Sequence, residues 1–421
     1  MKSSTSLATH LFIDGIETLW EPMSNVHSVA IGVFVRCGSM NETPEDSGIS
    51  HILEHMAFKG TSIYPEAKQL SMIVQGKGGT LNAYTDRDVT AYYIKCLPSE
   101  ILRAAKVLRE LVLHALLREE DLAIEKGAIL SEILGIDDDP STYIWEKLYS
   151  ARYPDQAFGM PIIGTKETVE GMTAERVEAY RDRYYHPSNF FISAAGAISL
   201  DELQAVVGLF QTNGRPAPSG VLSPIFPQAQ ACPKEVLIED SVEQTTFVLA
   251  AEGPKENDPD AYAAELADTI FGGPMFSRLF IEVRERRGLV YGINSFAWGN
   301  SHHGLVGVYG ECDPENYDEV YDIVQRELRN LRSNGLTSEE LELALGSRLG
   351  KIALSNETSN SRMFYNAQCF IHKGGLISLE DEMANYSAVT LDEVNAYCAS
   401  YMLDDKTSLI RVIPQDIVTL E

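Results

Sequence analysis

The chain has 421 residues, 44% of them hydrophobic, and its 34 basic and 61 acidic side chains give a formal net charge of −27. This length and composition predict more than one globular domain. The acidic excess argues against nucleic acid and anionic membrane surfaces as partners, because both attract basic proteins, and it leaves basic peptides as candidate partners.

The N-terminal residues and the cysteines favour a cytoplasmic protein. Residues 1–22 contain no apolar segment of signal-peptide length and no Arg-rich amphipathic pattern. The longest apolar runs, such as residues 29–35, are far shorter than the about 20 residues that cross a membrane. The six cysteines are scattered singly, without a C-x-x-C pair. We therefore expect reduced thiols, a cytoplasmic location and no membrane span.

An amphipathic helix is expected over residues 49–58. Apolar residues at positions 49, 52, 53 and 56 follow the spacing of a core-facing stripe. Asp46 or Ser47 is expected to cap the N-terminus of this helix, and Gly60 is expected to close its C-terminus. The helix is therefore well specified by local sequence.

The opposite face of this helix carries His51, Glu54, His55 and Phe58. Two histidines one helical turn apart can direct both imidazoles at one ion, and Glu54 lies beside them, near enough to hold a metal-bound water. The H-x-x-E-H pattern favours a metal site over an ordinary solvated helix face. A zinc site of this kind needs a third protein ligand.

A second helix, over residues 119–135, offers two carboxylates as the third ligand. Glu125 and Glu132 lie seven residues apart and therefore on one face, about 10.5 Å apart along the axis. Both cannot easily bind one ion directly, and spacing does not choose between them. The other histidines are isolated or adjoin in a polar turn, so they are poorer candidates.

The order of elements repeats after a proline-rich break near the middle of the chain. Residues 211–233 contain five prolines and no periodicity. Strands, an amphipathic helix, more strands and a helix pair follow in the same order on both sides, roughly 210 residues apart. We expect an α+β fold of two homologous domains, each an antiparallel sheet packed against helices, over residues 1–211 and 234–421 with a linker over 212–233.

The repeat is asymmetric in its chemistry. When Gly60 is aligned with Gly272, the positions of the second half opposite His51, Glu54 and His55 are Ala263, Leu266 and Ala267. The match of the helix segment REEDLAIEKGAILSEI to TSEELELALGSRLGKI places Lys351 opposite Glu132. The second domain is therefore expected to keep the scaffold without the candidate ligands.

With these residues in view, the sequence resembles the pitrilysin and mitochondrial processing peptidase family of zinc peptidases, which has an inverted H-x-x-E-H motif. Four blocks match in order: GSMNETPEDSGISHILEHMAFKGT, GGTLNAYTDRDVTAYYIKCL, EKGAILSEI and GGPMFSRLFIEVRERRGLVYGINSF. The resemblance implies one zinc ion per chain, bound by His51, His55 and Glu132. It makes Glu54 the general base and gives Glu125 a supporting role behind the ligands.

The resemblance also implies how a peptide binds. Asn82, Ala83 and Tyr84 match the edge strand to which a substrate adds as a further strand by main-chain hydrogen bonds. Phe58 resembles the residue that lines the pocket for the side chain just after the cleaved bond. These four residues are therefore candidates for substrate binding.

Four further positions bear on the substrate. Arg284 and Tyr291 match the family's arginine and tyrosine, which reach across to the substrate near the zinc. Members that recognise arginine upstream of the cut carry acids at the positions of Thr142 and Glu146. Only Glu146 is acidic here, so the chain departs from that pattern.

The function that the resemblance implies is a zinc-dependent endopeptidase that hydrolyses unfolded peptides inside a closed chamber of four such domains. Two domains make half of this clamshell chamber, so we expect a homodimer, with a heterodimer of related chains as the alternative. The competing function is a non-catalytic structural or processing-enhancing subunit of the same fold. The intact set of candidate ligands favours the enzyme.

Overall fold

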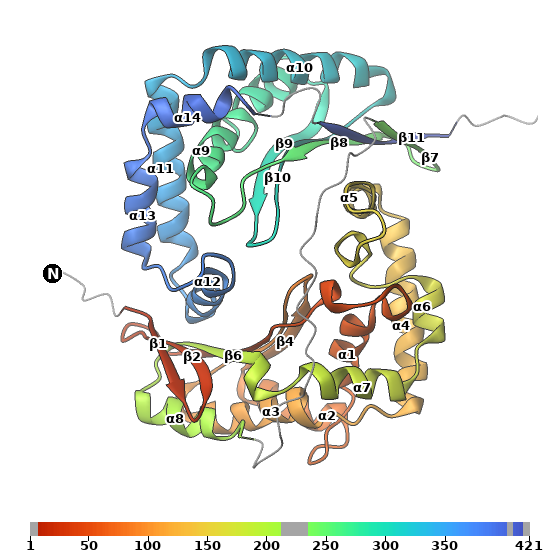
Figure 1. Cartoon of the computed structure of the whole chain (residues 1–421), viewed down its shortest axis with the longest axis vertical. Coiled ribbons are helices and arrows are strands. Elements are labelled where there is room, and N and C mark those ends of the chain that lie inside the picture. The colour runs from red at the N-terminus through yellow and green to blue at the C-terminus, as the bar shows by residue number, and fades with distance from the viewer. Residues whose placement is uncertain (1–6, 212–234, 402–406, 416–421) are drawn as a thin grey trace, which may run out of the picture.

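The computed structural model of the chain describes residues 7–211, 235–401 and 407–415. These residues form two β-sheets with helices packed on them, one sheet in each half of the chain (Figure 1). The linker expected over residues 212–233 lies outside the described residues. The domain boundaries at its two ends stay a prediction.

The first half forms a six-stranded sheet in the order β1-β2-β6-β3-β5-β4. β2 and β6 are parallel, and every other neighbouring pair is antiparallel. The strands are β1 (Thr9–Ile13), β2 (Ile16–Pro22), β3 (Val29–Val35), β4 (Thr80–Thr85), β5 (Thr90–Cys96) and β6 (Phe190–Gly196). The helices are α1 (Ile49–Ala57), α2 (Ala67–Val74), α3 (Ile101–His114), α4 (Glu119–Asp137), α5 (Pro140–Arg152), α6 (Lys166–Gly171), α7 (Ala174–Tyr184) and α8 (Leu200–Gly208).

The second half forms a five-stranded sheet in the order β7-β11-β8-β10-β9. Its strands are β7 (Glu235–Asp240), β8 (Thr245–Glu252), β9 (Val290–Gly299), β10 (Gly304–Cys312) and β11 (Ser408–Pro414). Its helices are α9 (Ala261–Phe271), α10 (Tyr317–Asn334), α11 (Ser338–Ser355), α12 (Ser359–His372), α13 (Leu379–Ala388) and α14 (Leu391–Cys398), and the short π-helix η7 (Phe280–Glu285) precedes β9.

The two sheets match strand for strand. The order β2-β6-β3-β5-β4 in the first corresponds to β7-β11-β8-β10-β9 in the second, and each has one parallel pair at the same place. The helices between corresponding strands also follow in the same order, so α1 corresponds to α9, α4 to α11 and α5 to α12. The predicted α+β fold of two homologous domains is confirmed.

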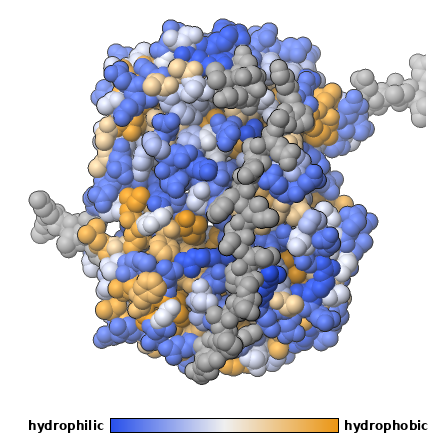
Figure 2. Space-filling model, viewed as in Figure 1, coloured by the Kyte–Doolittle hydropathy of each residue, from blue (hydrophilic) through white to orange (hydrophobic). Residues whose placement is uncertain are grey.

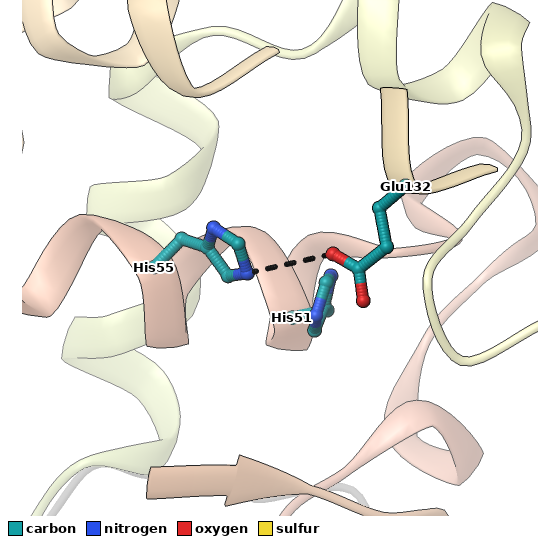
Figure 3. A group of neighbouring side chains, drawn as sticks. All are labelled: His51, His55 and Glu132. Carbon is teal, nitrogen blue, oxygen red and sulfur yellow. Dashed lines mark ion pairs between the residues drawn. The ribbon is translucent and has the colours of Figure 1, made fainter. Parts of the chain in front are cut away.

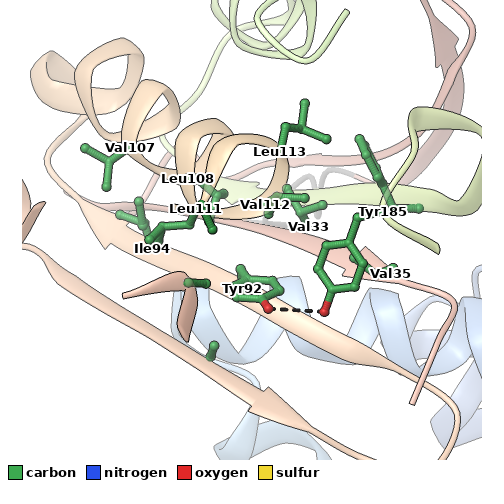
Figure 4. Close-up of a cluster of buried hydrophobic side chains, with 14 of the residues drawn as sticks. Val33, Val35, Tyr92, Ile94, Val107, Leu108, Leu111, Val112, Leu113 and Tyr185 are labelled. Carbon is green, nitrogen blue, oxygen red and sulfur yellow. Dashed lines mark hydrogen bonds between the residues drawn. The ribbon is translucent and has the colours of Figure 1, made fainter. Parts of the chain in front are cut away.

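The core of the first half lies between its sheet and α3. β3 is buried along its whole length because it lies in the middle of the sheet. The hydroxyls of Tyr92 and Tyr185 form a hydrogen bond of 3.1 Å inside this apolar cluster, so each buried hydroxyl has a partner (Figure 4). Each fully buried aliphatic side chain here contributes about 1.5–3 kcal/mol. The labelled members are Val33, Val35, Ile94, Val107, Leu108, Leu111, Val112 and Leu113.

The other face of the first sheet is covered by a helix of the second half. α12 lies against β2, β3 and β6 (Figure 1), where Met363 and Ala367 pack on Phe34 and Phe191. Close by, Arg362 of α12 forms a buried ion pair with Glu21 of β2 at 2.9 Å, and Asn366 donates a hydrogen bond to the same carboxylate. Breaking such a buried pair is strongly destabilising.

The first half covers the second sheet in the same way. α5 packs on β8 and β11, where Tyr143, Ile144 and Leu148 meet the buried residues Val248 and Ile410. Tyr143 also donates a hydrogen bond of 3.1 Å to Asp240 of β7. Each half therefore supplies one helix to the other half's sheet, and the two halves are interlocked.

The surface is unevenly polar in the view of Figure 2. Hydrophobic residues gather in the lower half, on the side where β1, β2 and α8 lie, whereas the upper half is mostly hydrophilic. Phe12 of β1 is 70% exposed. Among the described residues, no helix is both long and apolar enough to cross a membrane. The five cysteines described are buried free thiols, and Cys232 lies outside the described residues.

Candidate metal centre and active site

The helix α1 lies between α4, α7 and β4. Its residues Ile49, Ile52, Leu53 and Met56 are each no more than 1% exposed, so the predicted core-facing stripe is confirmed. The opposite face is partly exposed and lies beside α4 and the edge strand β4. The pattern of apolar residues thus fixes which face carries the candidate ligands.

The N-terminus of α1 is capped in a way that the sequence did not indicate. The expectation of a cap from Asp46 or Ser47 is wrong, because Gly48 takes the N-cap position with φ of 90°. Instead Glu42 accepts hydrogen bonds from the backbone N–H groups of Gly48 at 2.8 Å and Ser50 at 2.9 Å. Burial raises the pKa of Glu42 to about 7. Asp46 pairs with Arg176 instead.

Replacing Glu42 with alanine should destabilise the protein by about 1–3 kcal/mol, because two buried backbone N–H groups at the start of α1 lose their acceptor. Glu42→Gln keeps one oxygen acceptor and should lose less. The measurement is chemical unfolding of each variant. Glu45→Ala is the matched control, since Glu45 is exposed. Equal stability of Glu42→Ala and this control would contradict the role of Glu42 in the cap.

The side chains of His51, His55 and Glu132 come together on α1 and α4. One potential ligand atom from each lies within 4.8 Å of the others. His55 Nε2 and a carboxylate oxygen of Glu132 point toward one another over 3.9 Å (Figure 3). The two imidazole rings lie 4.5 Å apart, centroid to centroid. The structure thus brings together the two histidines and the glutamate that the resemblance implied as ligands.

Glu125 contacts the other side of the His55 ring. Its carboxylate lies 3.0 Å from His55 Nδ1, whereas Glu132 faces Nε2. Both glutamates of α4 therefore lie beside one imidazole, on opposite nitrogens, and only Glu132 lies on the same side as His51 in the cluster of potential ligand atoms. Glu125 is 6% exposed and pairs with the ammonium of Lys59. When the carboxylate accepts a hydrogen bond from Nδ1–H, the unprotonated Nε2 is free to bind a metal.

The donor set fits zinc. Two imidazoles and one carboxylate, with a further position left open, are typical of catalytic zinc sites. Burial, followed in importance by the neighbouring His55, lowers the pKa of His51 to about 4, so its ring is neutral near pH 7. A neutral imidazole is the form that binds a metal. His51, His55 and Glu132 are therefore the side chains that could hold zinc.

Glu54 is held in place by a residue of the edge strand. Thr85 of β4 donates a hydrogen bond of 2.6 Å to one carboxylate oxygen of Glu54. Burial raises the pKa of Glu54 above its ordinary value, although this hydrogen bond opposes the shift. A carboxylate with a raised pKa beside a metal site is suited to take up and release a proton.

The strand β4 is the free edge of the first sheet, as expected from the resemblance. Asn82 is exposed, and its side-chain oxygen accepts a hydrogen bond of 3.0 Å from the N–H of Ala83. In an antiparallel ladder the N–H and C=O of one residue point to the same side. Ala83 therefore directs both groups to the free edge rather than to β5.

Phe58 and Tyr84 are both half-buried. Phe58 directly follows α1 and packs against the core of the first half. Tyr84 of β4 lies beside Tyr93 and beside Phe364 of α12. The ring of Tyr84 therefore connects the edge strand to the helix supplied by the second half.

Arg284 and Tyr291 lie together in the second half. The guanidinium of Arg284 lies 5.3 Å from the ring of Tyr291 and 5.1 Å from that of Phe280. Tyr291 is 82% exposed on the edge strand β9. Within the described residues, no hydrogen bond or ion pair joins either side chain to the histidine cluster, which lies in the other half (Figure 1). The structure brings this pair together but not to the cluster.

Glu146 lies on α5, half-buried, and burial raises its pKa. Thr142, the other position of the family's acidic pair, is exposed and donates a hydrogen bond to Asp139 at the start of the same helix. The side chain of Thr142 therefore stabilises the N-terminal turn of α5.

In the second half, the three positions aligned with His51, Glu54 and His55 are occupied by core residues. Ala263, Leu266 and Ala267 of α9 are 4% exposed or less and pack in the core of that half. Lys351 of α11 is exposed. The positions that the sequence alignment sets opposite the histidines therefore contribute to the core of the second half.

Two contacts of the site were missed in the sequence. Thr85 is close in the sequence to the candidate residue Asn82, but the side chain that it contacts, Glu54, lies 31 positions earlier in the chain. Lys59 lies just after the end of α1 and pairs with Glu125 of α4, a contact between segments that are distant in the sequence.

Taken together, the fold and the donor set are those of the two-domain, pitrilysin-like class of zinc peptidases. Residues 18–166 match the family model described as Insulinase (Peptidase family M16), and residues 171–347 match the model described as Peptidase M16 inactive domain. The chain belongs to peptidase family M16.

Relatives are similar along most of the chain. An uncharacterized zinc protease of Streptomyces coelicolor is 32% identical over 91% of this chain and 84% of its own length. One of Bacillus subtilis is 31% identical over 93% and 95%. The crystal structure of a protease from Helicobacter pylori, 18% identical, superposes with a TM-score of 0.87 over 97% of this chain and 100% of that one. The last likeness bears on the fold alone.

Proposed function

We propose that the protein is a zinc-dependent endopeptidase that hydrolyses unfolded peptides. The observation that carries this proposal is the cluster of His51, His55 and Glu132, with Glu54 held beside it by Thr85. The names of the relatives, which call them zinc proteases, support the choice of metal.

The chain's own residues would carry the proton transfers. Zinc, when bound by the two histidines and Glu132, supplies a Lewis acid that polarises the scissile carbonyl and makes water a better nucleophile. Glu54 takes the proton of the attacking water and passes it to the leaving amine. Thr85 keeps the carboxylate of Glu54 directed at this position through its hydrogen bond. No covalent intermediate is required.

The free edge of β4 would hold the substrate as an extra strand. Ala83 offers its N–H and C=O to the peptide main chain, and the side chain of Asn82 gives way as the strand docks. Main-chain hydrogen bonds do not depend on the substrate's side chains, so they give little sequence specificity. Phe58 lines the pocket for the residue after the cleaved bond, where an apolar side chain is favoured, and Tyr84 supports the strand from its buried side.

The working unit would be a homodimer that encloses a chamber. Among the residues that the structure describes, no hydrogen bond or ion pair joins Arg284 or Tyr291 to the histidine cluster of their own chain, and Tyr291 is largely exposed. In a dimer this pair would reach the substrate bound at the partner's cluster, where a phenol and a guanidinium can stabilise the developing oxyanion. A lone Glu146 fits tolerance of basic peptides better than strict selection of arginine.

The purified protein should bind about one zinc ion per chain and cleave a mixed oligopeptide library. A chelator should abolish the cleavage, and added zinc should restore it. The measurements are metal analysis and mass spectrometry of the digest with and without chelator. A protein that binds no divalent metal at micromolar zinc would exclude the enzyme. Zinc binding without any cleavage would favour a non-catalytic subunit.

A further inference from the structure

Lys59 makes a contact that the proposed chemistry does not use. Its ammonium pairs with one oxygen of Glu125, and the other oxygen of the same carboxylate lies 3.0 Å from His55 Nδ1. Lys59, Glu125 and His55 therefore form a chain of contacts that ends at the proposed metal ligand. Figure 3 shows the free side of the His55 ring directed at Glu132.

The burial of Glu125 gives this contact its importance. The side chain of Glu125 is 8% exposed, whereas that of Glu132 is 48% exposed. A carboxylate removed from water must be balanced by a cation and by hydrogen bonds to stay in place. Lys59 supplies the cation, and His55 supplies the hydrogen bond.

The backbone of Lys59 is fixed where the helix α1 ends. Its N–H donates to the carbonyl of Met56 at 3.1 Å, and its own carbonyl accepts a hydrogen bond of 3.2 Å from the guanidinium of Arg118. Arg118 directly precedes α4, the helix that carries Glu125. The ammonium is therefore held between the end of one helix and the start of the other.

We propose that Lys59 is a positioning residue for the metal site, acting through Glu125 on His55. Its charge holds the Glu125 carboxylate against Nδ1 of His55, so that the ring keeps its proton on Nδ1 and offers Nε2 to the metal. Lys59 is the one lysine or arginine in the described part of the chain that pairs with Glu125, so without its ammonium the carboxylate is held less firmly and the His55 ring is free to rotate or to change tautomer. This inference rests on the zinc role proposed above.

The test measures zinc affinity instead of activity. Lys59→Met should weaken zinc binding about tenfold, the low end of the effect of residues behind metal ligands, in a competition titration of the apoprotein with a chromogenic chelator. Lys59→Arg, which keeps a cation, should restore most of the affinity. Lys126→Met is the matched control, because the Lys126 ammonium binds the carbonyl of Glu170 at 2.9 Å instead.

A double-mutant cycle tests whether Lys59 acts on His55 through Glu125. Glu125→Gln alone should weaken zinc binding, and adding Lys59→Met to it should cause little further loss. The double variant removes both charges of the pair, the partly exposed ammonium and the buried carboxylate, so it can be measured if Lys59→Met alone does not fold. Wild-type affinity in folded Lys59→Met, or equal losses with and without Glu125→Gln, overturns the inference. A wild-type protein that binds no zinc would instead overturn the proposed function.

Discussion

Glutamine in place of Glu54 should lower kcat for peptide hydrolysis by about 10²- to 10⁴-fold, the usual contribution of general acid–base catalysis. The amide cannot take a proton from water, but it can still accept the hydrogen bond that Thr85 donates to Glu54. Zinc content should stay at the wild-type level, because the ligands proposed are His51, His55 and Glu132. Steady-state kinetics on one oligopeptide and metal analysis of the same sample check both expectations.

The matched control for this variant is Glu120→Gln. Glu120 is an exposed residue in the first turn of α4, so its replacement removes the same charge away from the cluster. It should leave kcat unchanged. Full activity of the Glu54 variant would mean that another group takes the proton. Loss of zinc together with activity would mean that Glu54 has a structural part in the site.

Mixing two inactive variants should restore activity if Arg284 and Tyr291 act across a dimer. Tyr291→Phe alone should lower kcat/KM by about 10²- to 10³-fold, as expected for the loss of one oxyanion donor. In a dimer of this variant with Glu54→Gln, one site combines an intact cluster with an intact tyrosine from the partner. Random pairing at equal amounts completes about a quarter of all sites. Coexpression and assay of the mixture measure this fraction.

Two outcomes of the mixing experiment distinguish the assemblies. If the tyrosine serves the cluster of its own chain, no site is complete in the mixture, and activity stays at the level of the single variants. The control pairs Glu54→Gln with His51→Ala, which both disable the cluster and should restore nothing in either arrangement. Recovery in this control would contradict the assignment of both residues to one site.

The local parts of the site could be predicted from sequence. The 3.6-residue periodicity places His51 and His55 on one face of α1 and buries Ile52 and Leu53 on the other, because the spacing of apolar residues decides which face of a helix packs on the core. The spacing of Glu125 and Glu132 showed that they share a face, and the choice of Glu132 came from the resemblance. The structure adds that both touch His55, one at each nitrogen.

Contacts between distant segments could not be predicted in this way. Glu42 caps α1 across a short 3₁₀ turn, η2 (Pro44–Asp46), and nothing in its neighbours indicates that its carboxylate turns back. Thr85 reaches Glu54 only because β4 lies beside α1. These contacts depend on how the helices and strands pack together. Local sequence patterns do not predict that packing.

The exchange of α5 and α12 between the two halves is the geometry of a domain-swapped dimer contained in one chain. α12 of the second half covers one face of the first sheet, and α5 of the first half covers one face of the second, so each half depends on the other to bury that face. The first half expressed alone should therefore expose Phe34 and Phe191 and associate through that face.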